Sequence, residues 1–292
     1  MKPFHQIAGY WIARKRADPG MLAAANDAVA NLKPVVVVTG GSRGIGLALA
    51  QRFAEAGDSV MLVARAQDEL DKAAAQIRAK VTGATVLTAS IDLTQPHAAP
   101  LLEQHLRAAG SYADVLVNNA AIGLAGPFHK ASADKLQTLV SLNVGAPTVL
   151  MAYFLPGMLG RRRGGILNIG SLGGAVPGPG QSAYYASKSY LQALSEAAAA
   201  EYAGCGVRIS ALLPGPVNTT FHASMGAEQS PYRLLLPALS PERAARAGYN
   251  GFAFGKRVIV PGLFNKVMYV AVRMLPHPVT MPFVKFLLRT SD

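Results

Sequence analysis

Cysteine is almost absent from this chain of 292 residues, in which Cys205 is the only one. A single cysteine excludes an intrachain disulfide and any metal site built from several thiolates. The six histidines are scattered without the spacing of metal ligands, so we expect no metal site. This cysteine usage fits a reducing compartment.

Acidic residues are also scarce, with 16 Asp and Glu against 28 Lys and Arg and a formal net charge of +12. Such an excess could attract nucleic acid, a membrane surface or anionic small molecules. The basic residues form short clusters at 14–16 and 161–163 and continue through the tail from 256 to 289. These clusters lack the interleaved aromatic side chains of single-strand binding surfaces. We therefore expect no nucleic-acid partner.

Long apolar runs are missing, and no run reaches the roughly eighteen residues that a bilayer-spanning helix needs. The first residues show neither the apolar core nor the cleavage site of a secretory signal, so we expect a cytoplasmic location. Apolar residues nevertheless make up 51% of the chain and charged residues 15%. This composition can bury a sizeable core and argues against disorder.

Short apolar strands alternate with helical patterns along most of the chain. Residues 34–39 (PVVVVT) form a β-branched run, followed by glycines and by a helical pattern that ends at Gly57. The other expected strands are 59–64, 84–89, 113–120, 164–171, 207–215 and 257–262, with helices up to Lys80 and at 132–159 and 181–203. Apolar strands that alternate with helices predict an α/β fold with a doubly wound, seven-stranded parallel sheet. Ligands bind such sheets beyond the carboxyl ends of the strands.

The chain divides into three parts. We expect an N-terminal extension at 1–33, one domain at 34–262 and an apolar, basic tail at 263–292. Within the domain, residues 218–241 are expected to form a mobile loop that closes over a substrate, with Gly226, Pro231 and Pro237 interrupting its helical stretches.

A glycine-rich turn, Thr39-Gly40-Gly41-Ser42-Arg43-Gly44-Ile45-Gly46, directly follows the first strand. Glycines let the strand reverse into a helix and let a pyrophosphate approach the backbone, where the positive helix end faces it. Such turns also arise for steric reasons alone, but the position after the first strand favours a dinucleotide. The predicted contacts are Gly40, Ser42, Arg43, Gly44, Ile45 and Gly46.

The second strand ends at Arg65, without the carboxylate that would bind a free ribose 2′-hydroxyl. A guanidinium suits a 2′-phosphate instead, so Arg65 and Arg43 favour NADPH over NADH. Both arginines could equally be solvated surface residues. Asp92, beside Leu93 after the third strand, either accepts a hydrogen bond from the adenine amino group or caps the following helix.

Further motifs follow the later strands: Asn118-Asn119-Ala120, Ser171, Tyr184 with Lys188, and Pro214-Gly215. With the glycine-rich turn, they make the chain resemble the short-chain dehydrogenase/reductase family from about Pro34 to Gly262. The resemblance implies a Rossmann fold, NADP(H) as cofactor, and hydride transfer between nicotinamide and a carbonyl or secondary alcohol. It also implies a homodimer or homotetramer. Ala121 departs from the family, which usually has glycine there, and its methyl group is expected to shift that turn slightly.

The family's catalytic tyrosine and lysine are four residues apart, as are Tyr184 and Lys188, which places them on one helix face. Tyr185 lies three residues before Lys188, and we interpret it as pocket wall or packing. A phenol with a pKa near 10 is a poor proton shuttle at neutral pH. We therefore expect the Lys188 ammonium, together with the charge of an oxidised nicotinamide, to lower the pKa of Tyr184.

The resemblance assigns roles to several other residues. Lys188 would also hold the nicotinamide ribose, Ser171 would donate to the substrate oxygen, and Asn143 would hold a water that links the lysine to solvent. The remaining predicted cofactor contacts are Asn119, Ala120, Pro214, Gly215, Val217 and Thr219, the last at the nicotinamide carboxamide. Each side chain alone could be a cap, a core hydrogen-bonding group or a turn hydroxyl. The complete set in chain order favours catalysis.

The substrate is less well determined by the sequence. Ile122, Leu124, Leu172, Val176 and Phe221 could wall an apolar pocket or belong to an ordinary core, and His129 and His222 are interpreted as bystanders. The apolar residues of the 218–241 loop suggest a lipophilic ketone, such as a 3-oxoacyl chain or a steroid-like ring.

Both ends of the chain combine apolar and basic residues. Phe4, Ile7, Tyr10, Trp11 and Ile12 precede the cluster at 14–16, and the tail repeats this pattern at 263–275 and 281–289. Such segments can lie on a membrane surface, here the inner face, or pack against a subunit or the substrate cleft. The alternative functions are a membrane-associated scaffold and a non-catalytic NADP-binding protein.

Overall fold

A computed structural model describes residues 19–227 and 229–289. The aromatic and basic segment at 4–16 lies outside these residues. Within them, seven strands form one parallel sheet in the order β3-β2-β1-β4-β5-β6-β7. The strands are β1 (Lys33–Thr39), β2 (Ser59–Ala64), β3 (Val86–Ser90), β4 (Ser111–Asn118), β5 (Gly164–Ile169), β6 (Val207–Leu212) and β7 (Val258–Ile259). The predicted doubly wound sheet is confirmed.

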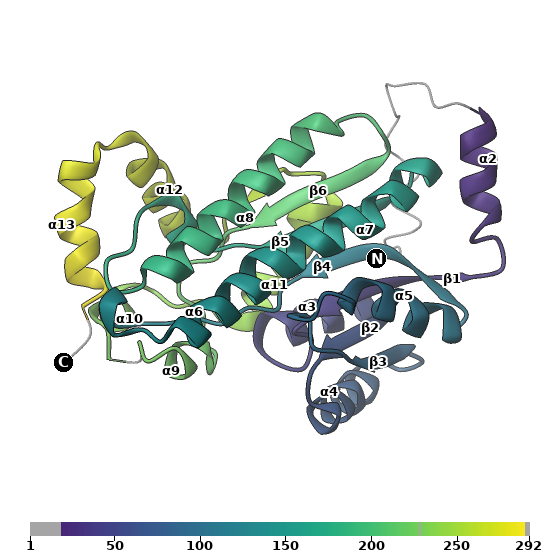
Figure 1. The fold of residues 1–292 in the computed structure, drawn as a ribbon, viewed down its shortest axis with the longest axis horizontal. Coiled ribbons are helices and arrows are strands. Elements are labelled where there is room, and N and C mark those ends of the chain that lie inside the picture. The colour runs from purple at the N-terminus through teal and green to yellow at the C-terminus, as the bar shows by residue number, and fades with distance from the viewer. Residues whose placement is uncertain (1–18, 228, 290–292) are drawn as a thin grey trace.

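Helices cover both faces of the sheet (Figure 1). One layer contains α3 (Gly44–Glu55), α4 (Gln67–Lys80) and α11 (Pro241–Ala253), whose apolar side chains share one core cluster. The other layer contains α5 (Ala98–Ala108), α7 (Ala146–Arg161) and α8 (Ser182–Glu201) around a second cluster. α2 (Pro19–Asp27), in the predicted extension, contacts α7.

The valine run of β1 explains why the chain is strand here. Val36 and Val38 belong to one core cluster, and Val35 and Val37 belong to the other. Successive side chains of a strand point to opposite faces, so a continuous β-branched run fills both layers at once. The central strand is therefore buried on both faces.

Most strands differ from the predicted bounds by one to three residues. β3 begins two residues later than expected, and β4 begins at Ser111, because Gly110, with φ 61°, ends the preceding turn. β7 pairs only through Val258 and Ile259 with β6. A short edge strand limits the exposed hydrogen-bonding groups that could recruit another chain.

A continuous helical segment runs from Ala133 to Arg161, comprising α6 (Ala133–Val140), a π-helical turn at Ser141–Gly145, and α7. Within the described residues it is the one helix that is long and apolar enough to cross a membrane, by length and composition only. The sequence shows no uninterrupted apolar run here, because polar residues divide the segment. Its contacts with α5, β4 and β5 are those of a core helix.

The loop at 218–241 contains two short helices, α9 (Phe221–Ser224) and α10 (Pro231–Leu235). The prediction that Pro231 interrupts a helix was wrong. Pro231 occupies the first turn of α10, where its fixed φ favours helix initiation.

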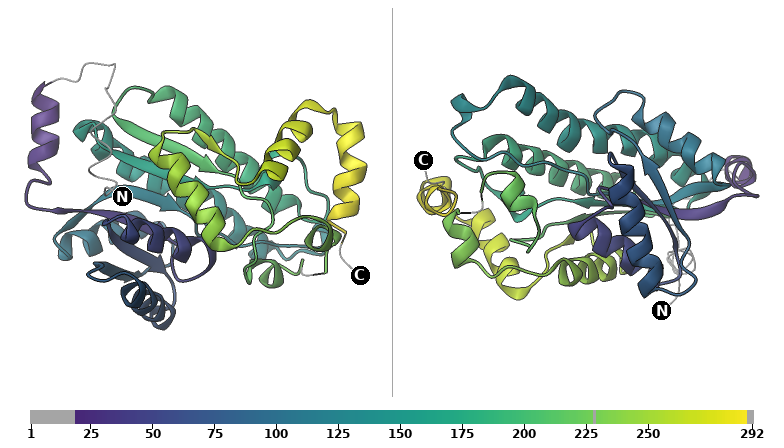
Figure 2. Two further views of the ribbon diagram at one scale, coloured as in Figure 1. Left: turned by 180° about the vertical axis from the view of Figure 1, so that it is seen from behind. Right: turned by 90° about the horizontal axis from the view of Figure 1, so that it is seen from below.

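The tail forms α12 (Leu263–Met274) and α13 (His277–Leu287), which stand together at one end of the molecule beside α10 (Figures 1 and 2). Val284, Leu287 and Leu288 pack into a third core cluster with Val176, Met225 and Tyr232. The tail therefore packs against the 218–241 loop.

Candidate active site

A cavity of about 680 Å³ lies at the carboxyl ends of the strands. Its lining runs from the glycine-rich turn after β1 past the ends of β2 to β6, and it ends between α9, α10, α12 and α13. Most of the predicted site residues line it: Gly40, Ser42, Arg43, Gly44, Ile45, Arg65, Asp92, Leu93, Asn119, Ala120, Ser171, Tyr184, Lys188, Pro214, Gly215, Val217 and Thr219. Gly46 and Asn143 do not line it.

The glycine-rich turn needs glycine for two physical reasons. Gly40 and Gly44 have φ of 60° and 58°, in the left-handed region that other residues rarely adopt. A Cβ on Gly46 would lie 2.3 Å from the carbonyl oxygen of Gly40. Gly46 is therefore a packing residue that lets α3 approach the turn, which corrects its prediction as a direct cofactor contact.

Thr39 and Asn119 hold this turn in place. The Asn119 Nδ2 donates to the carbonyl oxygens of Thr39 (2.9 Å) and Gly40 (3.0 Å). The Thr39 hydroxyl accepts from the backbone N–H groups of Asn119 (2.9 Å) and Ala120 (3.1 Å). The Asn118-Asn119-Ala120 motif thus ties the end of β4 to the end of β1.

At the far end of the cavity, Arg43 and Arg65 are exposed. Ser42 donates to Glu69 Oε2 at 3.3 Å, so a carboxylate that sequence reasoning missed also lies here. Asp92 accepts from the backbone N–H (3.0 Å) and hydroxyl (2.8 Å) of Thr94, which lowers its pKa. Asp92 therefore caps a local turn, because α5 begins only at Ala98.

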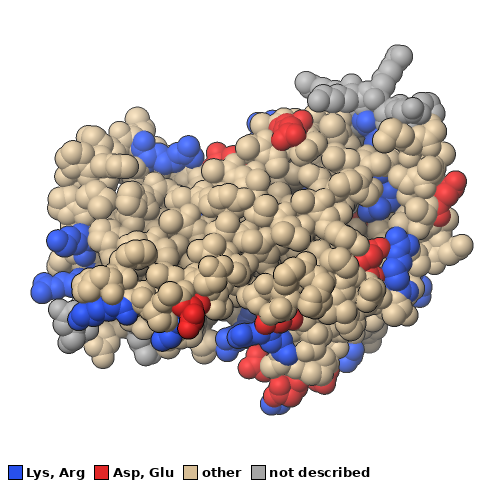
Figure 3. All heavy atoms as spheres, in the orientation of Figure 1, with Lys and Arg blue, Asp and Glu red and all other residues tan. Residues whose placement is uncertain are grey.

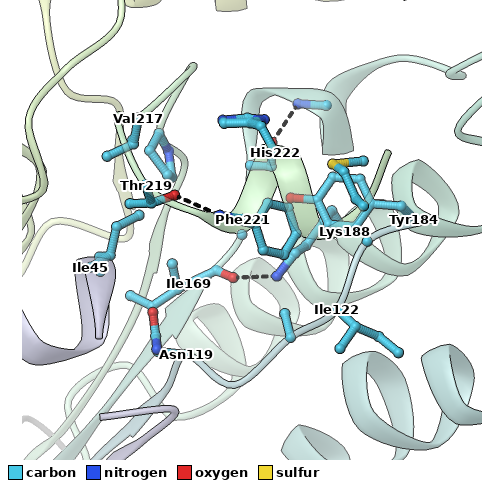
Figure 4. A pocket seen from close by; sticks show the side chains of 18 of the residues that line it. Ile45, Asn119, Ile122, Ile169, Tyr184, Lys188, Val217, Thr219, Phe221 and His222 are labelled. Carbon is cyan, nitrogen blue, oxygen red and sulfur yellow. Dashed lines mark hydrogen bonds between the residues drawn. The ribbon is translucent and has the colours of Figure 1, made fainter. Parts of the chain in front are cut away.

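The catalytic candidates meet where β5 ends. Ser171 follows the strand, and Tyr184 and Lys188 lie on α8, with the Lys188 Nζ 5.8 Å from the centre of the Tyr184 ring. The Lys188 Nζ donates to the carbonyl oxygen of Ile169 at 2.8 Å (Figure 4). The predicted four-residue spacing therefore does bring the phenol and the amine to one face.

Burial controls the ionisation of both groups. It raises the pKa of Tyr184, an effect that a hydrogen bond from Ser171 partly offsets and nearby Tyr232 reinforces. Burial lowers the pKa of Lys188 to about 8. In the protein alone, desolvation outweighs the hydrogen bond from Ser171, and the expected lowering of the Tyr184 pKa by Lys188 together with an oxidised nicotinamide stays a prediction. Tyr184 therefore carries its proton at neutral pH, and release of that proton requires a cationic group that stabilises the phenolate.

Asn143 lies in the π-helical turn and is buried away from the cavity. Its Oδ1 accepts from the backbone N–H of Ile122 at 3.0 Å, and its Nδ2 donates to the Ile122 carbonyl (2.8 Å) and to Ser187 Oγ (3.1 Å). The side chain thus ties the segment after β4 to α8 and contacts neither Tyr184 nor Lys188 through these bonds.

Tyr185 lines the cavity and also packs between two glycines. A Cβ on Gly178 would lie 2.3 Å from its ring, and one on Gly173 would lie 2.9 Å away, so the ring is wedged between two glycines. Ile122, Leu172, Val176 and Phe221 line the cavity as expected, whereas Leu124 lines a smaller neighbouring hollow and His129 is exposed.

Sequence reasoning missed part of the cavity wall. These side chains come from segments outside the recognised motifs: Gln181, Met225, Tyr232, Phe264, Met268, Val272, Phe283 and Val284. The recurrence of apolar residues in the tail indicates helices that cover an apolar surface. It does not indicate which surface these helices cover.

The residues present fit a dinucleotide. Arg43 at the N-terminus of α3 makes no side-chain capping hydrogen bond, and the first N–H groups of a helix have no partner within it. Phosphates suit this helix end. Arg43 and Arg65 would then lie toward the adenosine end, and Thr219, Tyr184 and Lys188 toward the nicotinamide end. Among the described residues no cluster of His, Cys, Asp and Glu could hold a metal ion.

Known proteins with solved structures share this architecture. The short-chain dehydrogenase from Sphingobium yanoikuyae, in complex with NADPH, is 29% identical, with a TM-score of 0.74 over 89% of this chain and 98% of that chain. The bulky-bulky ketone specific alcohol dehydrogenase from Comamonas testosteroni is 28% identical, with a TM-score of 0.69 over 90% and 97%.

Sequence relatives agree with the structural ones. The NADP-dependent 3-hydroxy acid dehydrogenase of Salmonella typhi is 34% identical over 192 residues, which are 65% of this chain and 75% of that protein. The chain spans 60% of one matched curated relative and up to 86% of others. The family described as short chain dehydrogenase matches residues 34–230. The predicted family is therefore confirmed, and the chain belongs to the short-chain dehydrogenases.

Proposed function

We propose that this protein is an NADPH-dependent oxidoreductase that reduces a lipophilic ketone to a secondary alcohol. The observation that carries the proposal is the convergence of Ser171, Tyr184 and Lys188 at one point of a cavity that also contains the glycine-rich turn. A bound nicotinamide cofactor supplies the hydride. The protein's own groups must then orient the carbonyl and deliver one proton.

Each of the three side chains has a distinct task in this proposal. The Ser171 hydroxyl donates to the substrate oxygen as negative charge develops there. Tyr184, kept protonated by burial, gives its proton to the same oxygen. Lys188 is mainly cationic below its pKa of about 8, so it stabilises the phenolate that remains. Asn143 positions the segment at Ile122 and the helix that carries both residues.

The preference for NADPH is supported by Arg43 and Arg65 at the adenosine end. A guanidinium matches the geometry of a phosphate, so the two arginines would bind the 2′-phosphate. Relatives that use NADP, and a similar structure that holds NADPH, point the same way. The carboxylates of Glu69, which accepts from Ser42, and of Asp92 also line this end of the cavity and oppose the binding of a further phosphate.

A lipophilic substrate is supported by the end of the cavity that lies between α9, α10, α12 and α13. Apolar side chains line this end of the cavity: Ile122, Leu172, Val176, Phe221, Met225, Leu236, Met268, Val272, Phe283 and Leu287. Burial of such surface favours apolar ligands by about 25 cal/mol per Å². The alcohol dehydrogenase from Comamonas testosteroni, with its bulky ketone specificity, supports the same substrate class.

A carbonyl screen that follows NADPH absorbance tests this function. We expect turnover of bulky apolar ketones by the natural protein and a loss of about 100-fold or more in Ser171→Ala. Cofactor binding without turnover on any ketone, aldehyde or secondary alcohol would instead support a non-catalytic NADP-binding protein.

We also propose a homo-oligomer that assembles through α7 and α8. These helices expose Val149, Tyr153 and Tyr190. The face that they form carries few charged residues across its centre (Figure 3). Apolar faces of this kind commonly mark subunit interfaces. Light scattering that gives the monomer mass at micromolar concentration would contradict the proposal.

A peripheral contact with the inner face of a membrane is proposed for the tail. Outside the cavity, α12 and α13 expose Leu263, Val267, Val270, Met274, Val279 and Phe286. Residues 263–289 contain Lys266, Arg273, Lys285 and Arg289 and no acidic residue, which suits anionic lipid. Flotation with anionic and with uncharged vesicles tests this contact, and failure to float with either would contradict it. A scaffold without catalysis would float but show no ketone turnover.

A further inference from the structure

One polar cluster stands within the otherwise apolar end of the cavity. It consists of Gln181, which precedes α8, His222 on α9, and Tyr232 on α10, and all three line the cavity. The His222 Nδ1 and the Tyr232 hydroxyl are 2.7 Å apart, so they share one hydrogen bond. The proton delivery described above uses none of the three.

Within this cluster, Gln181 gives the reason to expect a ligand. Gln181 is 3% exposed, and its buried Nε2 meets no partner at full hydrogen-bond geometry, although the amide lies close enough to the Tyr232 hydroxyl to lower the pKa of that phenol. An unsatisfied buried polar group costs about 1–3 kcal/mol, and natural proteins rarely leave one unpaired. Gln181 lines the cavity beside Tyr232, but its Nε2 has almost no exposed surface, so a ligand oxygen pairs with it only when the amide turns toward the cavity.

The cluster is polar but uncharged at neutral pH. Burial lowers the pKa of His222 to about 4, and the positive charge of Arg233 adds to this effect. Burial raises the pKa of Tyr232 to about 12. The imidazole and the phenol are both neutral, so the cluster suits a hydroxyl or carbonyl oxygen better than a cation.

The cluster lies across Phe221 from the reacting groups. The ring of Tyr184 is 5.5 Å from that of Phe221, Phe221 is 5.9 Å from His222, and His222 is 5.6 Å from Tyr232. Figure 4 shows Tyr184, Phe221 and His222 together on one side of the pocket. A ketone at Ser171 and Tyr184 would therefore extend along Phe221 toward the cluster.

We propose that Gln181, His222 and Tyr232 form a second substrate subsite that hydrogen-bonds an oxygen remote from the reacting carbonyl. This inference rests on the proposed function and narrows its substrate class to lipophilic ketones that carry a second hydroxyl or carbonyl group. An apolar ketone without that oxygen fills the cavity but leaves the amide of Gln181 unpaired. A site built to bind such an oxygen discriminates against the analogue that lacks it.

Paired substrates of increasing length test the subsite. Methyl ketones with a linear alkyl chain are compared with the same ketones bearing a terminal hydroxyl, at each chain length from about four to twelve carbons, the span of a small-molecule ligand. We expect kcat/KM for the hydroxyketone to exceed that of the plain ketone by about 10-fold at one or two adjacent lengths. In Tyr232→Phe and Gln181→Leu this ratio should fall toward 1.

A matched control removes a hydroxyl elsewhere. Tyr202, the C-cap residue of α8, lies outside the cavity, so Tyr202→Phe should keep the full ratio. Plain ketones turned over at every length with no advantage from the hydroxyl would overturn the subsite while leaving the proposed function intact. A ratio that survives in both subsite variants would also overturn it. Absence of turnover with all substrates would overturn the proposed function itself.

Discussion

Lys188 is a buried cation whose charge the protein interior disfavours. It is 4% exposed, and burial lowers its pKa from 10.5 to about 8. Its ammonium group donates a hydrogen bond to the neutral carbonyl oxygen of Ile169, not to a carboxylate. A residue retained at such a cost to stability is typical of a functional site.

The pH dependence of reduction should report this lysine. Its charge is present below about pH 8 and is lost above it, while the raised pKa of Tyr184 keeps the phenol protonated through the same range. We expect kcat for ketone reduction to fall as pH rises through about 8. In Lys188→Arg, whose charge persists, the residual activity should show no such fall. A natural enzyme with constant kcat from pH 7 to 10 would contradict this assignment.

Replacing the lysine should also stabilise the fold. The native state binds fewer protons than the unfolded chain between about pH 8 and the ordinary lysine value of 10.5. Lys188→Met should therefore raise the free energy of unfolding by on the order of 2 kcal/mol below pH 8, and this gain should shrink as pH rises to 10.5. Denaturant unfolding at pH 7 and pH 10 measures both values. A destabilised variant at pH 7 would show that the amine contributes net stability.

Arg65 tests the cofactor preference at the same scale. Arg65→Ala should raise the KM for NADPH by about 10-fold or more and change the KM for NADH little, since only NADPH has the 2′-phosphate. Arg246 is exposed on α11 away from the cavity, so Arg246→Ala serves as the control. Equal effects of Arg65→Ala on both cofactors would contradict binding of the 2′-phosphate.

At the scale of elements, the turn between β1 and α3 has little room for change. A Cβ on Gly46 meets backbone at 2.3 Å, whereas one on Gly145, in the π-helical turn, meets nothing closer than 3.9 Å. Turn and helix must therefore separate if any other residue replaces Gly46. The phosphate-binding geometry depends on this close packing.

Gly46→Ala should consequently lower stability by about 1–3 kcal/mol, the usual cost of overpacking, and weaken NADPH binding. Gly145→Ala, in helical backbone with free space, should be neutral or stabilising by up to about 1 kcal/mol. Thermal unfolding with and without NADPH measures both properties. Two variants with the same stability would mean that the turn relaxes without strain.

The prediction of elements succeeded where one residue type dictates the local structure. The valines of β1 and the glycines of the following turn leave few alternatives, and their bounds were nearly correct. The loop at 218–241 and the tail were harder, because their short helices owe their position to tertiary packing in the third core cluster. No local pattern says that His222 and Tyr232, ten residues apart, will share a hydrogen bond.

At the scale of the whole molecule, the sequence motifs identify the cofactor half of the cavity better than the substrate half. Motif residues from the ends of β1, β4, β5 and β6 converge there because the carboxyl ends of parallel strands meet at one edge. The pKa of Tyr184 could not be predicted this way. It depends on how completely the loop and tail cover the phenol, and only the assembled fold reveals this.

The central claim is that Tyr184, and not its neighbour, delivers the proton. The most direct measurement compares kcat for NADPH-dependent ketone reduction in Tyr184→Phe and Tyr185→Phe, with correct folding checked by circular dichroism. We predict a loss of about 100-fold or more for Tyr184→Phe and a smaller loss for Tyr185→Phe, through altered packing against Gly173 and Gly178. Retention of most activity in a folded Tyr184→Phe protein, with loss in Tyr185→Phe, would contradict the account.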